Sequence, residues 1–188
     1  MADSVIEIGD TTHPRGVAIN GRGDSTAATL VWAALDTTIQ VIDSLSGATT
    51  GRTPGPGRLV ARVGALRSNP FVVTVLDTLD SIAAVPPTVD TVTVSKPDSV
   101  SRLLTVEAFR GGIGSALRRI ALSIDFPPGG TGITLVPGDT IVTGPSGTAS
   151  FKVQLTGVRP DSAVITASAT YHGVAVPGSP HFVVVFLP

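Results

Sequence analysis

The sequence contains no cysteine, few aromatic residues and little charge. Without cysteine the chain forms no disulfide and no thiolate metal site. Its 13 Lys and Arg residues nearly balance its 14 Asp and Glu residues, which leaves a net charge of −1. Nucleic-acid binding needs a basic surface, so we expect no nucleic-acid partner. Even the apolar run from 182 to 187 is far shorter than the roughly 20 residues of a membrane-spanning helix, so we expect no membrane span.

Residues that favour helices are also scarce, whereas residues that favour strands are abundant. The chain has two Glu, two Lys and one Met, but 25 Val, 23 Thr and 12 Ile, so about a third of it is β-branched. β-branched side chains lose rotamer freedom in helices and pack well on a pleated sheet. Together, 21 Gly and 15 Pro supply turns between short strands. The composition therefore predicts an all-β protein.

The length of 188 residues fits two sandwich domains of ordinary size. Hydrophobic periodicity weakens after residue 76, and Pro86-Pro87 then favours extended backbone and removes two hydrogen-bond donors. We predict a first domain over 1–76, a short proline-containing linker over 77–87 and a second domain over 88–188.

Seven strands are expected in the first domain. Asn20-Gly21 begins a hairpin turn that ends at Asp24, because Asn-Gly readily adopts positive φ. Trp32 lies within a strand, where its large ring can cover much of a thin core. The predicted strands are Ser4–Ile8, Gly16–Asn20, Thr29–Ala33, Thr38–Ile42, Ala48–Gly51, Arg58–Val63 and Phe71–Leu76.

Strict alternation is clearest in the second domain. Over Thr148–Leu155, apolar and polar residues alternate, which directs one face to a core and the other to water. Further strands are expected at Thr91–Ser95, Leu103–Phe109, 120–126, 165–169 and 182–187. The predicted core residues are Trp32, Ile39, Val41, Leu59 and Ala61 in the first domain, and Ile120, Leu122, Phe151, Val153, Leu155, Ile165, Phe182 and Val184 in the second.

The first domain resembles the bacterial immunoglobulin-like group 2 repeat over about residues 5–76. The likeness is carried by Val31-Trp32-Ala33-Ala34-Leu35-Asp36, Ile39-Gln40-Val41-Ile42-Asp43 and Ser46-Gly47-Ala48-Thr49-Thr50-Gly51. It continues through Pro56-Gly57 and Leu59-Val60-Ala61-Arg62-Val63-Gly64.

The second domain resembles the group 1 type of the same repeats, found in invasin- and intimin-like adhesins. Here the likeness is carried by Thr143-Gly144-Pro145-Ser146-Gly147-Thr148-Ala149 and Val164-Ile165-Thr166-Ala167. Both resemblances imply immunoglobulin-like β-sandwiches in exported, cell-surface proteins, where such domains act as rods, spacers or adhesive tips and not as enzymes. They also imply a signal peptide, which this segment lacks, because Met1-Ala2-Asp3 begins no basic-then-apolar stretch.

The residues that could carry catalysis show no catalytic spacing. A Ser-His-Asp arrangement needs a histidine oriented by an acid, whereas we expect His13, His172 and His181 to be solvated histidines in turns. No zinc-ligand spacing connects the three histidines. The aspartates at strand ends, expected to cap backbone donors there, are Asp10, Asp43, Asp98, Asp139 and Asp161. We therefore predict no catalytic, cofactor-binding or metal residues and no cofactor.

Four weaker patterns leave alternatives open. Asp77, Asp80 and Asp90 could hold calcium near the linker, although their spacing is unlike that of an EF-hand. Arg22-Gly23-Asp24 suggests integrin binding, but a hairpin turn explains the same residues. Gly111-Gly112-Ile113-Gly114-Ser115 lacks the third glycine of a phosphate loop and is expected to be a flexible loop. Arg118-Arg119 is too small a basic cluster to bind nucleic acid.

The function that we expect is structural and non-enzymatic, at a bacterial surface or outside the cell. The chain would act as a stalk, or as the repeating subunit of a fibre in which a terminal strand, or 79–85, pairs with the next subunit. Its partners would be neighbouring immunoglobulin-like domains or identical subunits. The alternatives are a ligand-binding adhesin or carbohydrate-binding module, with Tyr171 as a stacking platform, and an accessory domain of a larger secreted enzyme.

Overall fold

The computed structural model describes residues 5–95 and 99–188, which divide into two compact units, Met1–Thr78 and Leu79–Pro188. Both units consist of strands, and the helix found among the described residues is the single 3₁₀ turn η1 (Pro128–Gly130). The prediction of an all-β fold is confirmed.

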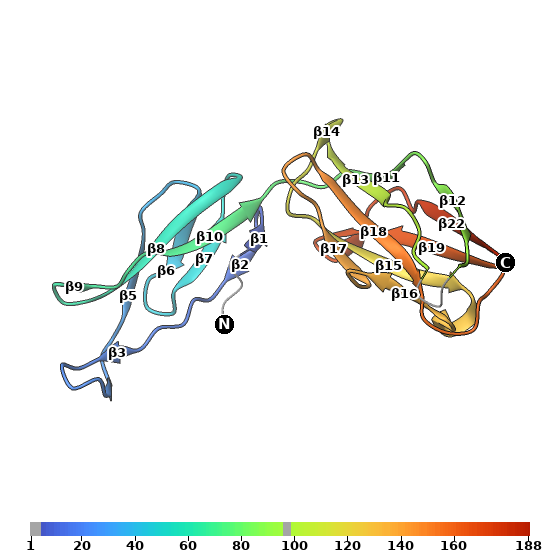
Figure 1. The fold of residues 1–188 in the computed structure, drawn as a ribbon. Coiled ribbons are helices and arrows are strands. Elements are labelled where there is room, and N and C mark those ends of the chain that lie inside the picture. Colours follow the sequence, from blue (N-terminus) through green and yellow to red (C-terminus); the bar gives the residue numbers. More distant parts are fainter. Residues whose placement is uncertain (1–4, 96–98) are drawn as a thin grey trace. The chain divides into compact units, whose positions relative to one another are not determined.

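Unit 1 has two sheets (Figure 1). The first has the order β1-β10-β8-β5, with β9 beside β8, and the second has the order β2-β7-β6. The bounds are β1 Val5–Glu7, β2 Thr11–Thr12, β5 Val31–Ala34, β6 Ile39–Asp43, β7 Ala48–Gly51, β8 Gly55–Val63, β9 Leu66–Arg67 and β10 Phe71–Leu76. The first strand runs parallel to the last, with Val5 opposite Thr74 and Glu7 opposite Leu76.

The core of unit 1 forms where alternate residues of the two sheets meet. Its buried members are Ile6, Ile39, Leu59, Val73 and Val75, and the predicted core residue Val41 packs against them half-buried. A Cβ atom at Gly57 would lie 2.7 Å from Cγ2 of Ile39. The absence of a side chain at position 57 therefore lets the sheets approach closely.

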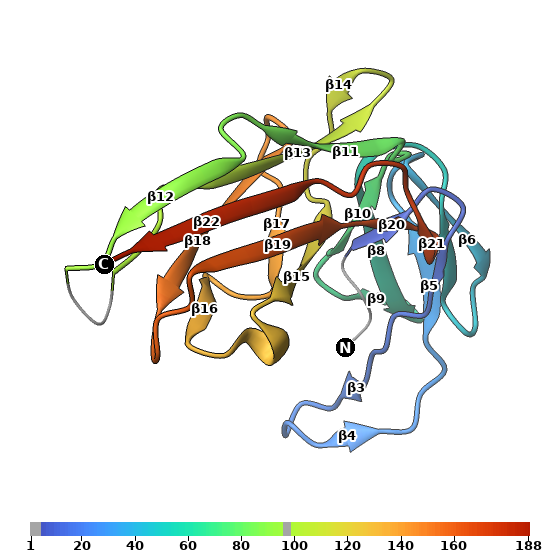
Figure 2. The ribbon, with the colours of Figure 1, turned by 90° about the vertical axis from the view of Figure 1, so that its right-hand side faces the viewer.

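Strands β3 (Ala18–Ile19) and β4 (Ser25–Thr26) form a hairpin that pairs with no other strand of the described chain. Both views show it extending away from the sheets of unit 1 (Figures 1 and 2). The predicted turn at Asn20 is confirmed, because the Asn20 side chain accepts hydrogen bonds from the backbone N–H groups of Arg22 and Asp24. The turn leads into β4, however, and not directly into the tryptophan strand as the sequence suggested.

Unit 2 also has two sheets, in the orders β11-β13-β18-β16, with β14 beside β13, and β12-β22-β19-β15-β17. A small hairpin, β20-β21, stands apart from both. The bounds are β11 Ser81–Val85, β12 Val89–Thr93, β13 Leu104–Arg110, β14 Ile113–Gly114, β15 Arg119–Phe126, β16 Ile133–Val136, β17 Thr140–Val142, β18 Thr148–Leu155, β19 Ser162–Ser168, β20 Thr170–Tyr171, β21 Val174–Ala175 and β22 His181–Leu187.

The segment 77–87, expected to be a linker, contains β11, which pairs antiparallel with β13. This expectation needs correction, since Ile82 is buried in the core of unit 2 and its strand is part of a sheet. After Pro86-Pro87 the chain crosses to the other sheet, where β12 pairs parallel with β22. The prolines lack N–H donors, so the sheet bonds end where the chain changes sheets.

The core of unit 2 contains all the residues predicted for it, from Ile120 to Val184. Phe151 and Phe182 are fully buried at its centre, with their rings edge to face and their centroids 5.2 Å apart. Each unit is a β-sandwich with its own apolar core.

Candidate functional site

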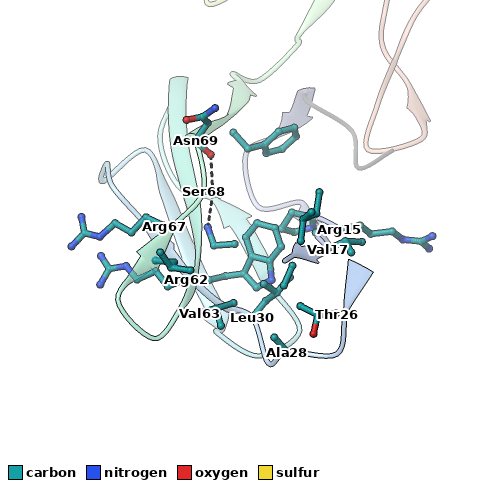
Figure 3. A pocket seen from close by; sticks show the side chains of 18 of the residues that line it. Arg15, Val17, Thr26, Ala28, Leu30, Arg62, Val63, Arg67, Ser68 and Asn69 are labelled. Atoms are coloured by element: carbon teal, nitrogen blue, oxygen red, sulfur yellow. Dashed lines mark hydrogen bonds between the residues drawn. The ribbon is translucent and has the colours of Figure 1, made fainter. Parts of the chain in front are cut away.

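Unit 1 contains a half-open cavity with a volume of about 890 Å³. Its walls come from the segment around β3 and β4 on one side and from the β8–β9 hairpin on the other. Figure 3 shows side chains from both walls, such as Val17 and Val63, and Trp32 also lines the cavity. Small-molecule sites commonly occupy about 300–1,000 Å³, so this cavity has the size of a ligand site.

Trp32 is held in place by both its backbone and its ring. The backbone N–H of Trp32 donates a hydrogen bond to the carbonyl of Ser44, with 2.8 Å between nitrogen and oxygen. This bond joins β5 to the turn after β6. The indole is buried against Gly47 and beside Gly16, where a Cβ atom would lie 3.3 Å from Cζ2. Trp32 and Ala61 are buried as predicted, but they line this cavity and stand outside the unit 1 core cluster.

The walls of the cavity carry large apolar side chains that water reaches. Val17 is 68% exposed, Ile19 67% and Leu66 75%. Val17 and Ile19 belong to the segment of the first hairpin, and Leu66 lies on the second, so apolar groups face the cavity from both sides. Large exposed apolar groups gathered around a hollow are typical of a binding surface.

The charged residues along the cavity are all arginines: Arg15, Arg62 and Arg67. In Figure 3, Arg62 and Arg67 extend outward on one side of the cavity and Arg15 on the opposite side. Arg62 and Arg67 are directly opposite each other in the β8–β9 register. Nε of Arg62 is buried and has no hydrogen-bond partner among the described residues.

None of the three histidines is among the residues that line this cavity. His13 is exposed after β2, and His172 occupies the turn between β20 and β21 at φ 48°, with its ring centroid 4.2 Å from that of Tyr171. The two turn positions agree with the sequence prediction. His181 is different, because it lies on an exposed sheet surface opposite Thr166.

Sequence reasoning missed the partners of His181. Nδ1 of His181 is 2.7 Å from the hydroxyl of Thr166, which also bonds the carboxylate of Asp125. The hydroxyl stands between imidazole and carboxylate, whereas a catalytic triad needs the imidazole between them. This arrangement is a cross-strand surface network and not a catalytic site.

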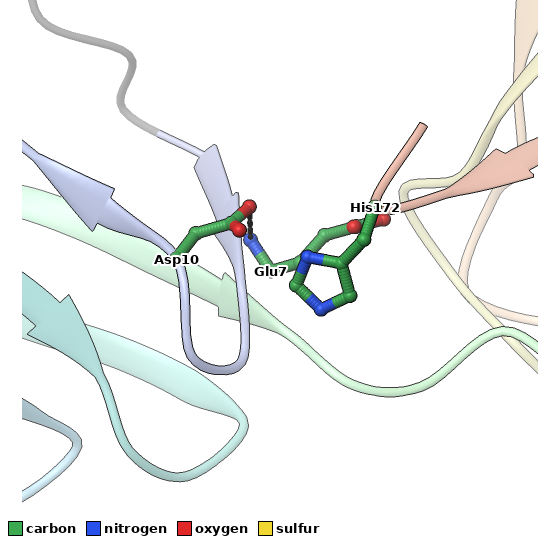
Figure 4. A group of neighbouring side chains, drawn as sticks. All are labelled: Glu7, Asp10 and His172. Atoms are coloured by element: carbon green, nitrogen blue, oxygen red, sulfur yellow. Dashed lines mark hydrogen bonds between the residues drawn. The ribbon is translucent and has the colours of Figure 1, made fainter. Parts of the chain in front are cut away.

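Aspartates at two strand ends bond backbone donors, as predicted. Oδ2 of Asp10 accepts a hydrogen bond from the N–H of Glu7 (Figure 4), and Oδ1 of Asp43 accepts one from the N–H of Leu45. The pKa of Asp43 lies below its ordinary value, mainly because its carboxylate accepts a hydrogen bond from the Ser46 side chain. The hydrogen bond from the N–H of Leu45 lowers this pKa further. Asp139 bonds the hydroxyl of Thr140, the carbonyl of Asp161 accepts from Phe186, and Asp98 lies outside the described residues.

The aspartates proposed for calcium have separate protein partners. Asp77 accepts from the N–H of Thr78, and Asp80 accepts from the N–H of Gly111. Asp90 is buried and binds Arg102, with 2.6 Å between its Oδ1 and Nε of Arg102. Burial would raise the pKa of Asp90, but hydrogen bonds from the backbone and side chain of Arg102 lower it below its ordinary value of 3.8.

The remaining patterns have structural explanations. Gly111 and Gly112, expected in a flexible loop, form the tight turn between β13 and β14, because both adopt positive φ. Arg118 is buried: its N–H donates to the hydroxyl of Thr143 and its Nε to that of Ser115. Arg119 is exposed, and Tyr171 is half-buried with Cζ of Arg118 5.8 Å from its ring centroid.

The described residues include no helix with the length and hydropathy of a membrane span.

No protein-family model and no curated protein matches the chain. Solved structures resemble it at low identity. The adhesin InvE of Yersinia pseudotuberculosis is 14% identical, with a TM-score of 0.47, over 95% of this chain and 56% of that one. Domains 4–9 of the surface layer protein SbsC are 13% identical, with a TM-score of 0.38, over 94% of this chain and 25% of that one.

A glycosyl hydrolase family 2 member from Bacteroides cellulosilyticus is 11% identical, with a TM-score of 0.42, over 86% of this chain and 22% of that one. The chain thus spans little more than half of the first of these proteins and about a quarter or less of the other two. Likeness at this level assigns no activity to the chain.

Proposed function

We propose that the chain is a stalk segment of a bacterial cell-surface or extracellular protein, and that its sandwiches resist tension between their ends. One observation carries this proposal: in each unit the last strand lies parallel to a strand near the start of the unit. β1 pairs with β10 in unit 1, and β12 pairs with β22 in unit 2. The parallel arrangement determines how a pulling force acts on each unit.

Tension applied between the start of β1 and the end of β10, or between the start of β12 and the end of β22, pulls the two paired strands in opposite directions along their length. All the hydrogen bonds between the two strands then carry the force together. In unit 2 the pairing extends from Val89 opposite Val183 to Thr93 opposite Leu187. The N–H of Val183 also bonds Thr88, and the N–H of Val94 bonds Leu187. Each bond contributes only about 1 kcal/mol, but simultaneous rupture raises the barrier to forced unfolding.

Single-molecule pulling tests this geometry, because a chain without cysteine accepts attachment points at chosen positions. A Val89→Cys, Leu187→Cys variant loads β12 and β22 in opposite directions. A Thr93→Cys, Leu187→Cys variant is the matched control, since these residues are opposite each other and pulling peels the strands apart one pair at a time. All three positions are exposed. We expect a clearly higher unfolding force from the first variant, and equal forces would overturn the proposal.

The pairing of the terminal strands also favours a stalk over a fibre built by strand exchange. β22 lies between β12 and β19, β1 pairs with β10, and β11 pairs with β13. A fibre that exchanges β22 would first have to release this strand from between β12 and β19. Electron microscopy of the purified chain separates the two functions: isolated particles support the stalk, and regular filaments support the fibre.

The finer assignments belong to the same proposal. We take the group 2-like character of residues 1–76 and the group 1-like character of 88–188 as proposals carried by the sequence resemblance. We also propose that the two units fold independently, because each has its own apolar cluster.

A further inference from the structure

The arginines along the unit 1 cavity carry positive charges that no nearby acidic side chain neutralises. Arg62 and Arg67 form a cross-strand pair of like charges, which destabilises a sheet. Arg15, Arg62 and Arg67 have no ion-pair partner among the described residues, and no Asp or Glu lines the cavity. A buried guanidinium donor without an acceptor, such as Nε of Arg62, adds a further cost. An anion bound at Arg62 and Arg67 would relieve the repulsion between the two guanidinium groups.

The interior of the cavity is apolar, in contrast to the arginines along it. The buried Trp32 lines the cavity, and the lining residues Val17, Ile19 and Leu66 are exposed. Covering such side chains with hydrocarbon gains about 25 cal/mol for each Å² of apolar surface removed from water. The arginine side chains extend outward from the cavity, so the apolar interior and the positive rim are separate regions (Figure 3).

We propose that the unit 1 cavity binds a single-chain amphiphile that has a hydrocarbon body and one anionic head group. The body lies against Trp32 between the two hairpins, and the head group binds the arginines at the rim. The volume of about 890 Å³ suits a small molecule.

The tryptophan of the site reports binding without a label, because Trp32 is the only tryptophan in the chain. We would titrate the full chain with dodecanoate below its micelle concentration and follow the Trp32 emission, with calorimetry for stoichiometry. Dodecan-1-ol tests the tail without the charge, dodecyltrimethylammonium tests the opposite charge, and acetate tests the head group alone.

We expect saturable 1:1 binding of dodecanoate. Loss of a charge-assisted hydrogen bond weakens affinity by about tenfold, so dodecan-1-ol should bind about tenfold more weakly. The cationic amphiphile should bind more weakly still, and acetate should not bind. Equal affinity for dodecanoate and dodecan-1-ol would overturn the proposal. Binding only to vesicles of anionic lipid, without binding of free dodecanoate, would also overturn it and would indicate a membrane surface as the partner.

Variants separate head-group recognition from the tail. The double change Arg62→Gln, Arg67→Gln should weaken dodecanoate binding at least tenfold and leave dodecan-1-ol binding unchanged. Arg119→Gln, an exposed arginine of unit 2, is the matched control and should change neither. Ile19→Ser should weaken the binding of both dodecanoate and dodecan-1-ol. Its position on the exposed hairpin keeps its effect on folding small. If Arg119→Gln weakened dodecanoate binding as much as the double variant does, a binding site at the rim would be contradicted.

Discussion

Gly47 lies against the indole of Trp32 so closely that a Cβ atom at position 47 would be 2.9 Å from both Cδ1 and Nε1 of the ring. Gly47 also has φ 77°, a conformation that costs other residues free energy. The tryptophan therefore depends on a glycine for its position in the lining of the cavity.

We predict that Gly47→Ala destabilises unit 1 by about 2–4 kcal/mol, because it adds backbone strain and a steric contact. Urea denaturation followed by Trp32 fluorescence measures this loss. Gly64→Ala is the matched control, since Gly64 also has positive φ but open space around it, and it should cost only about 1–2 kcal/mol. Equal losses in the two variants would show that the indole moves aside freely.

Truncation of Phe151 should destabilise unit 2. The side chain is fully buried, and its ring meets that of Phe182 at 5.2 Å. We predict that Phe151→Ala costs about 3–5 kcal/mol, because it leaves a cavity and removes the aromatic contact. Circular dichroism in urea measures the transition of unit 2.

The same variant tests whether the units fold independently. The Trp32 fluorescence transition reports unit 1 alone, and it should stay at the wild-type urea concentration in Phe151→Ala. A shift of both transitions by the same amount would contradict independent folding.

The strands that could be predicted from the sequence are those with strict alternation. Thr148–Leu155 has the predicted bounds, because burial on one face imposes a period of two. Short edge strands such as β17 (Thr140–Val142) were missed, since three residues establish no period. β11 was taken for a linker because the following prolines suggested a break in the fold, whereas they mark a change of sheet.

The cavity could not be predicted from the sequence. Trp32 was expected in the core because a large buried ring usually packs there, and it is indeed buried. Its role depends on residues distant in sequence: Val17 and Leu66 face the same hollow only because two hairpins stand on opposite sides of it. The like-charge pair of Arg62 and Arg67 likewise follows from the β8–β9 register. The sequence Arg62-Val63-Gly64-Ala65-Leu66-Arg67 could have suggested this hairpin, because Gly64 lies in its turn.

The ion pair of Asp90 and Arg102 should make unit 2 sensitive to acid. The pKa of Asp90 is lowered in the folded protein, so its stabilising effect is present above the unfolded value near 3.8 and is lost as pH falls through the folded pKa. Asp90→Asn should cost about 1–3 kcal/mol at neutral pH, because buried donors lose a charged acceptor.

The pH profile distinguishes this role from a simple packing defect. The difference in unfolding free energy between wild type and Asp90→Asn should shrink as pH falls below 3.8, because the wild-type carboxylate then takes up a proton. Asp36→Asn breaks the exposed ion pair with Arg58 and should have a much smaller effect. A difference that is constant with pH would count against the ion pair.

Thr143 connects two loops of unit 2 through one buried hydroxyl, which donates to the carbonyl of Ser115 at 2.7 Å and accepts from the N–H of Arg118 at 2.9 Å. Thr143→Val keeps the branched shape but leaves both backbone groups without this partner, so we predict a loss of about 1–3 kcal/mol in urea denaturation. Thr140→Val, at an exposed position of β17, should change stability by less than about 0.5 kcal/mol. Each variant replaces one threonine hydroxyl by a methyl group. An equal loss of stability in the two variants would therefore mean that burial of the Thr143 hydroxyl contributes nothing to stability.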